Sequence, residues 1–143
     1  MYKGLEVQIE MVREASQKLG PAITNPEDVW KLLSSLRKKD REHFVVICLN
    51  AKNRVICINT VSIGTLTSSA VCGREVFKPA ILANSANIIL AHNHPSGEPE
   101  PSDEDKKITK QIAEAGKILG IQVLDHVIIG SASWVSLKDR DVI

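Results

Sequence analysis

Two histidines separated by one residue, His92 and His94, begin the stretch of this sequence that is richest in potential metal ligands. The stretch reads HNHPSGEPEPSDED and ends at Asp105. Side chains two residues apart in a β-strand point to the same side, so both imidazoles can be directed at one point. Two imidazoles and one carboxylate suit a catalytic zinc site whose fourth position is left to water. Asp105 is the best candidate for that carboxylate, because the intervening loop is rich in the turn-forming residues Pro and Gly.

An ordinary helix start explains part of the same stretch. Ser102 is a good N-cap residue, and Asp105 can reach back to it as in a capping box. Acidic residues in a first helical turn also suit the positive end of the helix dipole. An isolated HxH is common and is a weak signal of metal binding. An HxH followed after seven residues by SxxD is much more specific than either part.

Apolar periodicity predicts the elements that must position these residues. The run NIILA (87–91) predicts a buried strand, which places His92 at the carboxyl end of that strand. Residues 103–119 predict an amphipathic helix that stops at Gly120. Residues 121–130 and 133–137 are apolar and predict two further strands.

The chain before the histidines predicts a hairpin and a helix. Residues 43–50 and 54–63 are apolar, β-branched runs joined by a polar turn, and we expect the first to be buried on both faces. The loop over residues 64–69 carries hydroxyls that could cap the next helix. That helix is predicted over residues 70–84, with Pro79 inside it as a kink.

The first 40 residues predict two helices. Residues 5–19 carry apolar side chains on one helical face and end at Gly20-Pro21. A second helix starts at Pro26 and ends in Arg37-Lys38-Lys39, a positive run that favours a solvated helix end over a phosphate contact. The whole order predicts a three-layer α-β-α architecture with a central mixed sheet. We divide the chain into a helical prefix, 1–24, and a single domain, 25–143.

Composition narrows the class of protein. The chain has 143 residues, and its 18 basic and 17 acidic residues give a net charge of +1, which gives no reason to invoke nucleic acid or a membrane surface. Three cysteines without CxxC spacing argue against a disulfide framework and suit a reducing compartment. The charged N-terminus does not resemble a signal peptide, and no apolar run approaches the roughly 20 residues that span a bilayer. We expect a soluble, cytoplasmic protein.

The HxH and SxxD string resembles the JAMM motif of the MPN (JAB) metalloprotease superfamily, and the RadC family within it most of all. REHFVVICLN, AHNHPSGEPEPSDED and VLDHVIIG resemble that family's segments in their usual order, over residues 25–143. The resemblance implies a JAB/MPN fold, of the cytidine-deaminase-like architecture. It also implies a Zn²⁺ ion held by His92, His94 and Asp105.

The resemblance further implies the catalytic residues. Glu42 matches the upstream glutamate that takes a proton from the zinc-bound water and passes it to the leaving amine. Ser102 matches the motif serine that helps to stabilise the tetrahedral oxyanion. From the residues alone, Glu75 is a rival base. We expect His43 to point away from Glu42, and His126 to be either a hydrogen-bonded core histidine or a partner of a metal ligand.

These expectations together indicate a zinc-dependent metallopeptidase or isopeptidase with a peptide or protein substrate. The alternative is a non-catalytic or DNA-associated RadC-type module that keeps its zinc. RadC proteins commonly carry a helix-hairpin-helix region before this domain, and no Gly-rich hairpin precedes Glu42 here, so a DNA-repair role is weakly supported. The lysines Lys106, Lys107 and Lys110 suit the solvated face of a helix. A homodimer is compatible with the sequence.

Overall fold

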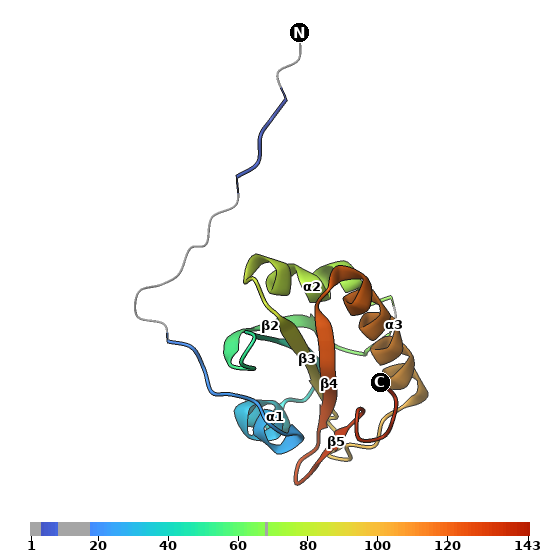
Figure 1. Ribbon diagram of the computed structural model, residues 1–143. Coiled ribbons are helices and arrows are strands. Elements are labelled where there is room, and N and C mark those ends of the chain that lie inside the picture. Colours follow the sequence, from blue (N-terminus) through green and yellow to red (C-terminus); the bar gives the residue numbers. More distant parts are fainter. Residues whose placement is uncertain (1–3, 9–17, 68) are drawn as a thin grey trace.

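The computed structural model describes residues 4–8, 18–67 and 69–143, and these contain one five-stranded sheet with helices on both faces (Figure 1). In chain order the elements are α1 (Pro26–Leu32), the 3-10 helix η1 (Ser34–Lys38), β1 (His43–Leu49), β2 (Val55–Ile63), α2 (Gly73–Leu82), β3 (Asn87–Asn93), α3 (Asp103–Leu119), β4 (Gln122–Ile129) and β5 (Trp134–Ser136). Within the described residues, no helix is both long enough and apolar enough to cross a membrane.

The sheet has the order β2-β1-β3-β4-β5. β1 pairs antiparallel with both β2 and β3, β3 pairs parallel with β4, and β4 pairs antiparallel with β5. β1 and β3 are buried at every position except the first of each, which confirms that the first hairpin strand is covered on both faces. The predicted mixed sheet is therefore confirmed.

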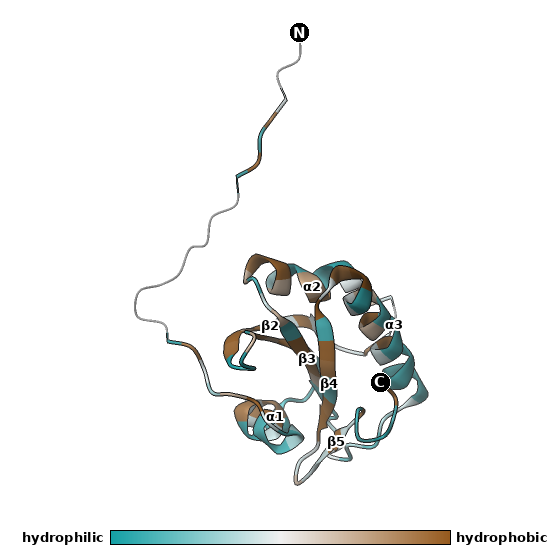
Figure 2. Cartoon of the chain, in the orientation of Figure 1, coloured by the Kyte–Doolittle hydropathy of each residue, from teal (hydrophilic) through white to brown (hydrophobic). Residues whose placement is uncertain are grey.

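Alternate residues of the central strands enter two separate cores. One face of the sheet packs against α2 and α3 through residues such as Phe44, Val46, Ile88 and Ile108. The other face packs against α1 through residues such as Val45, Ile89, Val29 and Val127. The predicted three-layer α-β-α architecture is confirmed. Because α3 packs on the sheet with one side only, it carries both brown apolar and teal polar residues along its length in Figure 2.

Local signals define α3 at both of its ends. Ser102 is the N-cap and forms a complete capping box with Asp105. Gly120 is the C-cap and has a φ of 73°, a left-handed conformation that glycine adopts without a Cβ penalty. The helix therefore spans the predicted residues 103–119.

Three predictions of helix position need correction or lie outside the description. The helix predicted from Pro26 to Lys39 ends at Leu32, and the 3-10 helix η1 follows it. The helix predicted over 70–84 spans only Gly73–Leu82. Its N-cap is Cys72, which makes no side-chain cap bond. The loop hydroxyl of Thr67 accepts from Ala70 N and so closes a separate turn before the helix. Residues 9–17 of the helix predicted over 5–19 lie outside the described part, and the described residues beside them form no helix or strand.

Arg37, the first residue of the basic run 37–39, packs on the protein, while Lys38 and Lys39 are exposed. The Arg37 guanidinium lies 3.3 Å from the ring centroid of Trp30, and its Nη2 donates to Trp30 O. The Trp30 indole in turn donates to Gly130 O at 3.2 Å. This stacking explains the structural role of Arg37 without a phosphate ligand.

The cysteine pair Cys48 and Cys57 lies directly across β1 and β2 as free thiols. Burial, followed by the neighbouring Cys57, raises the pKa of Cys48 to about 12. A thiol that stays protonated is a poor nucleophile, so Cys48 serves as a small core residue.

Candidate metal centre

The carboxyl end of β3 presents two imidazoles to one point. Nε2 of His92 and Nε2 of His94 lie 3.0 Å apart. Asn93 faces away from them, since its Oδ1 accepts from His43 N and its Nδ2 donates to Arg41 O. This is the alternation expected for an HxH at the end of a strand. The His92 side chain is fully buried, while that of His94 is 14% exposed.

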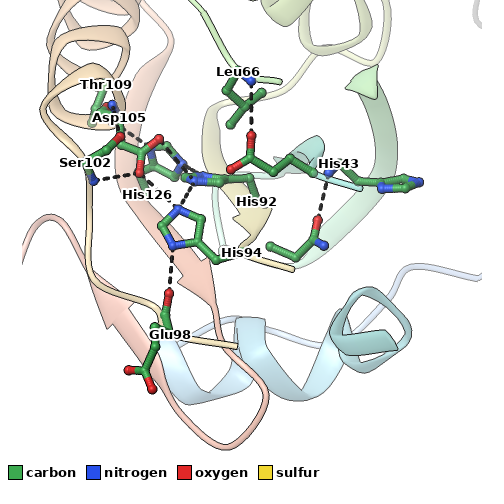
Figure 3. Close-up of polar contacts among 11 residues, drawn as sticks. His43, Leu66, His92, His94, Glu98, Ser102, Asp105, Thr109 and His126 are labelled. Atoms are coloured by element: carbon green, nitrogen blue, oxygen red, sulfur yellow. Dashed lines mark hydrogen bonds and ion pairs between the residues drawn. The ribbon is translucent and has the colours of Figure 1, made fainter. Parts of the chain in front are cut away.

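The first turn of α3 presents a carboxylate to the same point (Figure 3). Asp105 Oδ1 lies 3.3 Å from Nε2 of His92, and Oδ2 lies 3.1 Å from Nε2 of His94. Oδ2 also accepts from Ser102 N at 2.9 Å, as part of the capping box. The capping box therefore holds Asp105 in the orientation that faces the two imidazoles.

The spacing of these three side chains fits a tetrahedral zinc ion. Zinc bonds of about 2.0–2.1 Å place the ligand atoms of a tetrahedron about 3.3 Å apart. The two imidazole nitrogens lie 3.0 Å apart, and each lies 3.1 or 3.3 Å from a different carboxylate oxygen of Asp105, so the three groups are spaced close to that value. Nδ1 of His94 lies 2.8 Å from Glu98 O, and a carbonyl can only accept, so Nδ1 carries the proton. In the neutral ring this leaves a lone pair on Nε2, the atom that faces Asp105.

The charge at this point favours a bound cation. Burial by itself would raise the pKa of Asp105, but the contacts with His92 and His94 outweigh it and hold the pKa of that carboxyl well below its ordinary value. The hydrogen bond that the Asp105 carboxylate accepts from the protonated ring raises the pKa of His94. A buried carboxylate that keeps its charge needs a positive partner, which is either an imidazolium or a metal ion.

Glu42 lies on the same side of the sheet as the histidines. Phe44 of β1 is the register partner of His92, so two residues earlier Glu42 lies opposite His94. Ligand atoms of Glu42, His92 and His94 all lie within 4.8 Å of one another. Glu42 Oε2 also accepts from Leu66 N at 3.1 Å, which ties it to the loop after β2.

Two carboxylates therefore compete for the role of third ligand. Asp105 makes direct contacts of 3.1 and 3.3 Å with the imidazole nitrogens, and the ligand atoms of Glu42, His92 and His94 lie within 4.8 Å of one another. Both carboxylates are therefore candidate third ligands, Asp105 through its direct contacts and Glu42 through its place beside the imidazoles. The rival of Glu42 as the base, Glu75, is exposed on α2 and pairs with Lys78 at 3.2 Å.

Ser102 lies at the edge of the site with its side chain exposed. Its Oγ accepts from Asp105 N at 3.0 Å. A hydroxyl that accepts from an amide keeps its own proton free to donate. An open groove of about 390 Å³ lies beside the site, lined by residues 40–42, Gly64, Thr65 and Pro95.

His126 contacts one of the proposed metal ligands directly, a contact that the sequence alone could not establish. Its Nε2 lies 2.7 Å from Nδ1 of His92, and its other ring nitrogen contacts Thr109. Burial, followed by the charge of His92, lowers the pKa of His126 well below its ordinary value. Thr109 was missed by the sequence reasoning. Its only signal is its place one turn after Asp105 on the buried face of a helix.

Comparisons with known proteins show the family of this chain. The family described as "RadC-like JAB domain" matches residues 23–142. A UPF0758 protein of Caldanaerobacter subterraneus is 55% identical over 83% of this chain and 52% of its own length. A UPF0758 protein of Desulforamulus reducens is 50% identical over 96% of this chain and 64% of its own, and one of Methanosarcina barkeri is 48% identical over 82% and 52%. The chain thus spans between about half and two thirds of the length of these relatives. With a match over most of its residues, this chain belongs to the RadC-like JAB domain family.

Proposed function

We propose that this chain is a zinc-dependent hydrolase that cleaves peptide or isopeptide bonds. The observation that carries the proposal is the convergence of His92, His94 and Asp105 within 3.0–3.3 Å of one another, with a further carboxylate, Glu42, beside the imidazoles. A zinc ion held by the first three would act as a Lewis acid toward a carbonyl and would acidify a water molecule.

Glu42 is the proton carrier of the proposed reaction. Its carboxylate takes a proton as the water oxygen bonds to the carbonyl carbon, and it returns that proton to the nitrogen as the C–N bond breaks. The hydrogen bond from Leu66 N fixes one carboxylate oxygen and leaves the other for this transfer. The groove beside Glu42 is the side from which a substrate chain can enter.

Ser102 supports the same reaction step from the N-terminus of α3. Its hydroxyl proton is free to donate to the oxygen that becomes negative when water adds to the carbonyl. A donor placed in advance for that charge is typically worth about 10²–10³-fold in rate. The oxyanion role of Ser102 and its role as N-cap use different atoms, because capping uses only the oxygen lone pair.

The first test is metal content. We expect wild-type protein purified with zinc to contain about one ion per chain by elemental analysis, and His92→Ala and Asp105→Ala to lose it. A His43→Ala variant is the matched control, because His43 is a neighbouring histidine whose main-chain amide is bound by Asn93 on the other side of β3. Retention of zinc in both ligand variants would remove the proposed site.

The second test is hydrolysis of an unbiased peptide and isopeptide library. We expect Glu42→Gln to retain zinc and to lose activity by about 10²–10⁴-fold. Glu75→Gln is its matched control, with the same chemical change on an exposed glutamate that pairs with Lys78. Full activity in Glu42→Gln would reassign the base.

The alternative, a DNA-associated module, has a separate test. Phosphate contacts make affinity fall steeply with salt, so binding to duplex and single-stranded DNA should be measured by fluorescence anisotropy at low and at physiological salt. The hydrolase proposal expects no measurable binding at low salt. Salt-dependent binding together with no hydrolysis in the library would favour the alternative.

A further inference from the structure

A third imidazole lies behind the proposed metal centre, fully buried beneath His92. His126, on β4, contacts Nδ1 of His92 through its Nε2 at 2.7 Å. Its Nδ1 contacts Thr109 Oγ1 at 2.5 Å, and that hydroxyl donates to Asp105 O at 2.7 Å. Figure 3 shows this line of contacts between the sheet and the first turns of α3.

The donor and the acceptor of each hydrogen bond along this line can be assigned, and all the bonds run in one direction. A carbonyl oxygen only accepts, so the one proton of the Thr109 hydroxyl is used on Asp105 O. Thr109 Oγ1 must then accept, which makes Nδ1 of His126 the donor. In a neutral ring the other nitrogen of His126 carries the lone pair, so it accepts from Nδ1–H of His92.

This direction gives His92 the tautomer that a metal ligand requires. With the proton on Nδ1, the lone pair of His92 lies on Nε2, the atom 3.0 Å from Nε2 of His94 and 3.3 Å from Asp105. The converse also holds. A cation on Nε2 of His92 requires the proton on Nδ1, and the contacts through His126 and Thr109 accept it without rearrangement.

This line of hydrogen bonds also links two of the proposed metal ligands. It starts at one proposed ligand, His92 on β3, and ends at the main chain of another, Asp105 on α3. His126 provides the bridge from β4, and it is held in place by an edge-on contact with Phe44 at a centroid distance of 5.4 Å. Three consecutive elements, β3, α3 and β4, are thus joined through one line of hydrogen bonds.

We propose that His126 and Thr109 are positioning residues of the metal centre, which fix the tautomer and the ring plane of His92 and tie it to Asp105. The inference rests on the proposed metal site, but it assigns two residues to which the motif gives no role. Partners of this kind are usually carboxylates, carbonyls or water, and their loss typically weakens metal binding by about 10–100-fold. Here the buried imidazole of His126 takes the place of such a carboxylate, carbonyl or water.

The first measurement needs neither metal nor substrate. Long-range ¹H–¹⁵N NMR correlations of the imidazole side chains in metal-free protein report which ring nitrogen carries the proton. We expect His92 and His126 both to carry it on Nδ1 at neutral pH. In Thr109→Val, which keeps the shape but removes the acceptor, we expect this preference to be lost in His126. A His92 ring protonated on Nε2 in the wild type would overturn the proposal.

The second measurement is the zinc dissociation constant, obtained by competition with a chromophoric chelator. We expect Thr109→Val and His126→Leu to weaken zinc binding by about 10–100-fold and Thr109→Ser to restore it. Ser136→Ala is the matched control, since it also removes a buried hydroxyl from a hydrogen bond, in this case to Asp125. It should lose stability in urea with unchanged zinc affinity.

The outcomes separate this inference from the proposed hydrolase. Equal zinc affinity in wild type, Thr109→Val and a folded His126→Leu overturns the positioning role whatever the activity is. If His126→Leu does not fold, Thr109→Val and its rescue by serine decide the point. If the wild type binds zinc but hydrolyses nothing in the library, the hydrolase proposal fails while the affinity series still stands.

Discussion

At the scale of single residues, Ser102 and Asp105 belong both to a helix cap and to the proposed metal centre. From the sequence, a helix cap and a metal site both explain these residues, and the two explanations are compatible. The structure shows both sets of contacts, since Asp105 Oδ2 accepts from Ser102 N and also lies 3.1 Å from Nε2 of His94. A capped helix start fixes the carboxylate before any ligand binds, which reduces the ordering that binding requires.

The two roles of Ser102 can be separated by substitution. Glycine at an N-cap costs only a few tenths of a kcal/mol relative to serine, whereas alanine costs about 1 kcal/mol. We therefore expect Ser102→Gly to keep its urea midpoint and its zinc, while hydrolysis falls by about 10²–10³-fold if the hydroxyl stabilises the oxyanion. Ser102→Ala should lose the same activity and also unfold at lower urea.

Comparison of the two variants decides between the roles. Activity that follows stability, with Ser102→Gly close to wild type, would show that the serine acts only as a cap. Ser102→Thr is the conservative control, because threonine retains both the cap and a hydroxyl donor.

At the scale of elements, helices with local end signals were predicted best. The helix at 103–119 was placed correctly because Ser102 and Gly120 define its ends within the helix's own sequence. The helix predicted over 70–84 was placed too broadly, because nothing local distinguishes loop hydroxyls that cap a helix from those that close a separate turn. The strand predicted to end at Ala91 continues to Asn93, since pairing with β1 and β4 extends it.

Close packing of α3 against the sheet depends on Gly116. A Cβ at this position would lie 2.4 Å from the main-chain oxygen of Ile121 and 3.3 Å from Cζ of Phe77. We expect Gly116→Ala to destabilise the fold by about 1–3 kcal/mol in urea unfolding, because overpacking outweighs the better helix propensity of alanine.

Gly73 is the matched control for this prediction. It is also helical, at the start of α2, and a Cβ there meets nothing within 4 Å. Gly73→Ala should be neutral or slightly stabilising. If Gly116→Ala is as stable as Gly73→Ala, α3 can move away from β4 without cost, and the positioning of Asp105 would not depend on that packing.

At the scale of the whole molecule, the site was predictable to the extent that it is local in sequence. His92, His94 and Asp105 lie within 14 residues and could be recognised together. Glu42 is 50 residues away from His92, and only the pairing of Phe44 with His92 shows that it faces the imidazoles. His126 and Thr109 could not be assigned, because their contact requires β4 and α3 to meet over β3.

Two of the side-chain connections between the segment after β4 and the rest of the domain differ in strength. Arg140 makes a two-pronged contact with Glu100 in the loop of the site, at 3.0 and 3.1 Å. Both side chains are about half exposed or more, so we expect the pair to contribute less than about 1 kcal/mol. Asp125 makes the stronger connection, because it is buried and accepts from Ser136 Oγ, Lys138 N and His126 N.

Replacement of Asp125 should therefore destabilise the whole domain. Asp125→Ala leaves three buried or half-buried donors without their acceptor, and we expect a loss of about 3 kcal/mol in the free energy of unfolding, measured by urea denaturation. Asp125→Asn keeps one oxygen for the two main-chain amides and an NH₂ group for Ser136, so it should lose less. Arg140→Ala, which breaks the exposed contact alone, should stay within about 1 kcal/mol of wild type. If Arg140→Ala were as damaging as Asp125→Ala, the C-terminal segment would be held at the surface through Glu100, and the buried hydrogen bonds to β4 would contribute little.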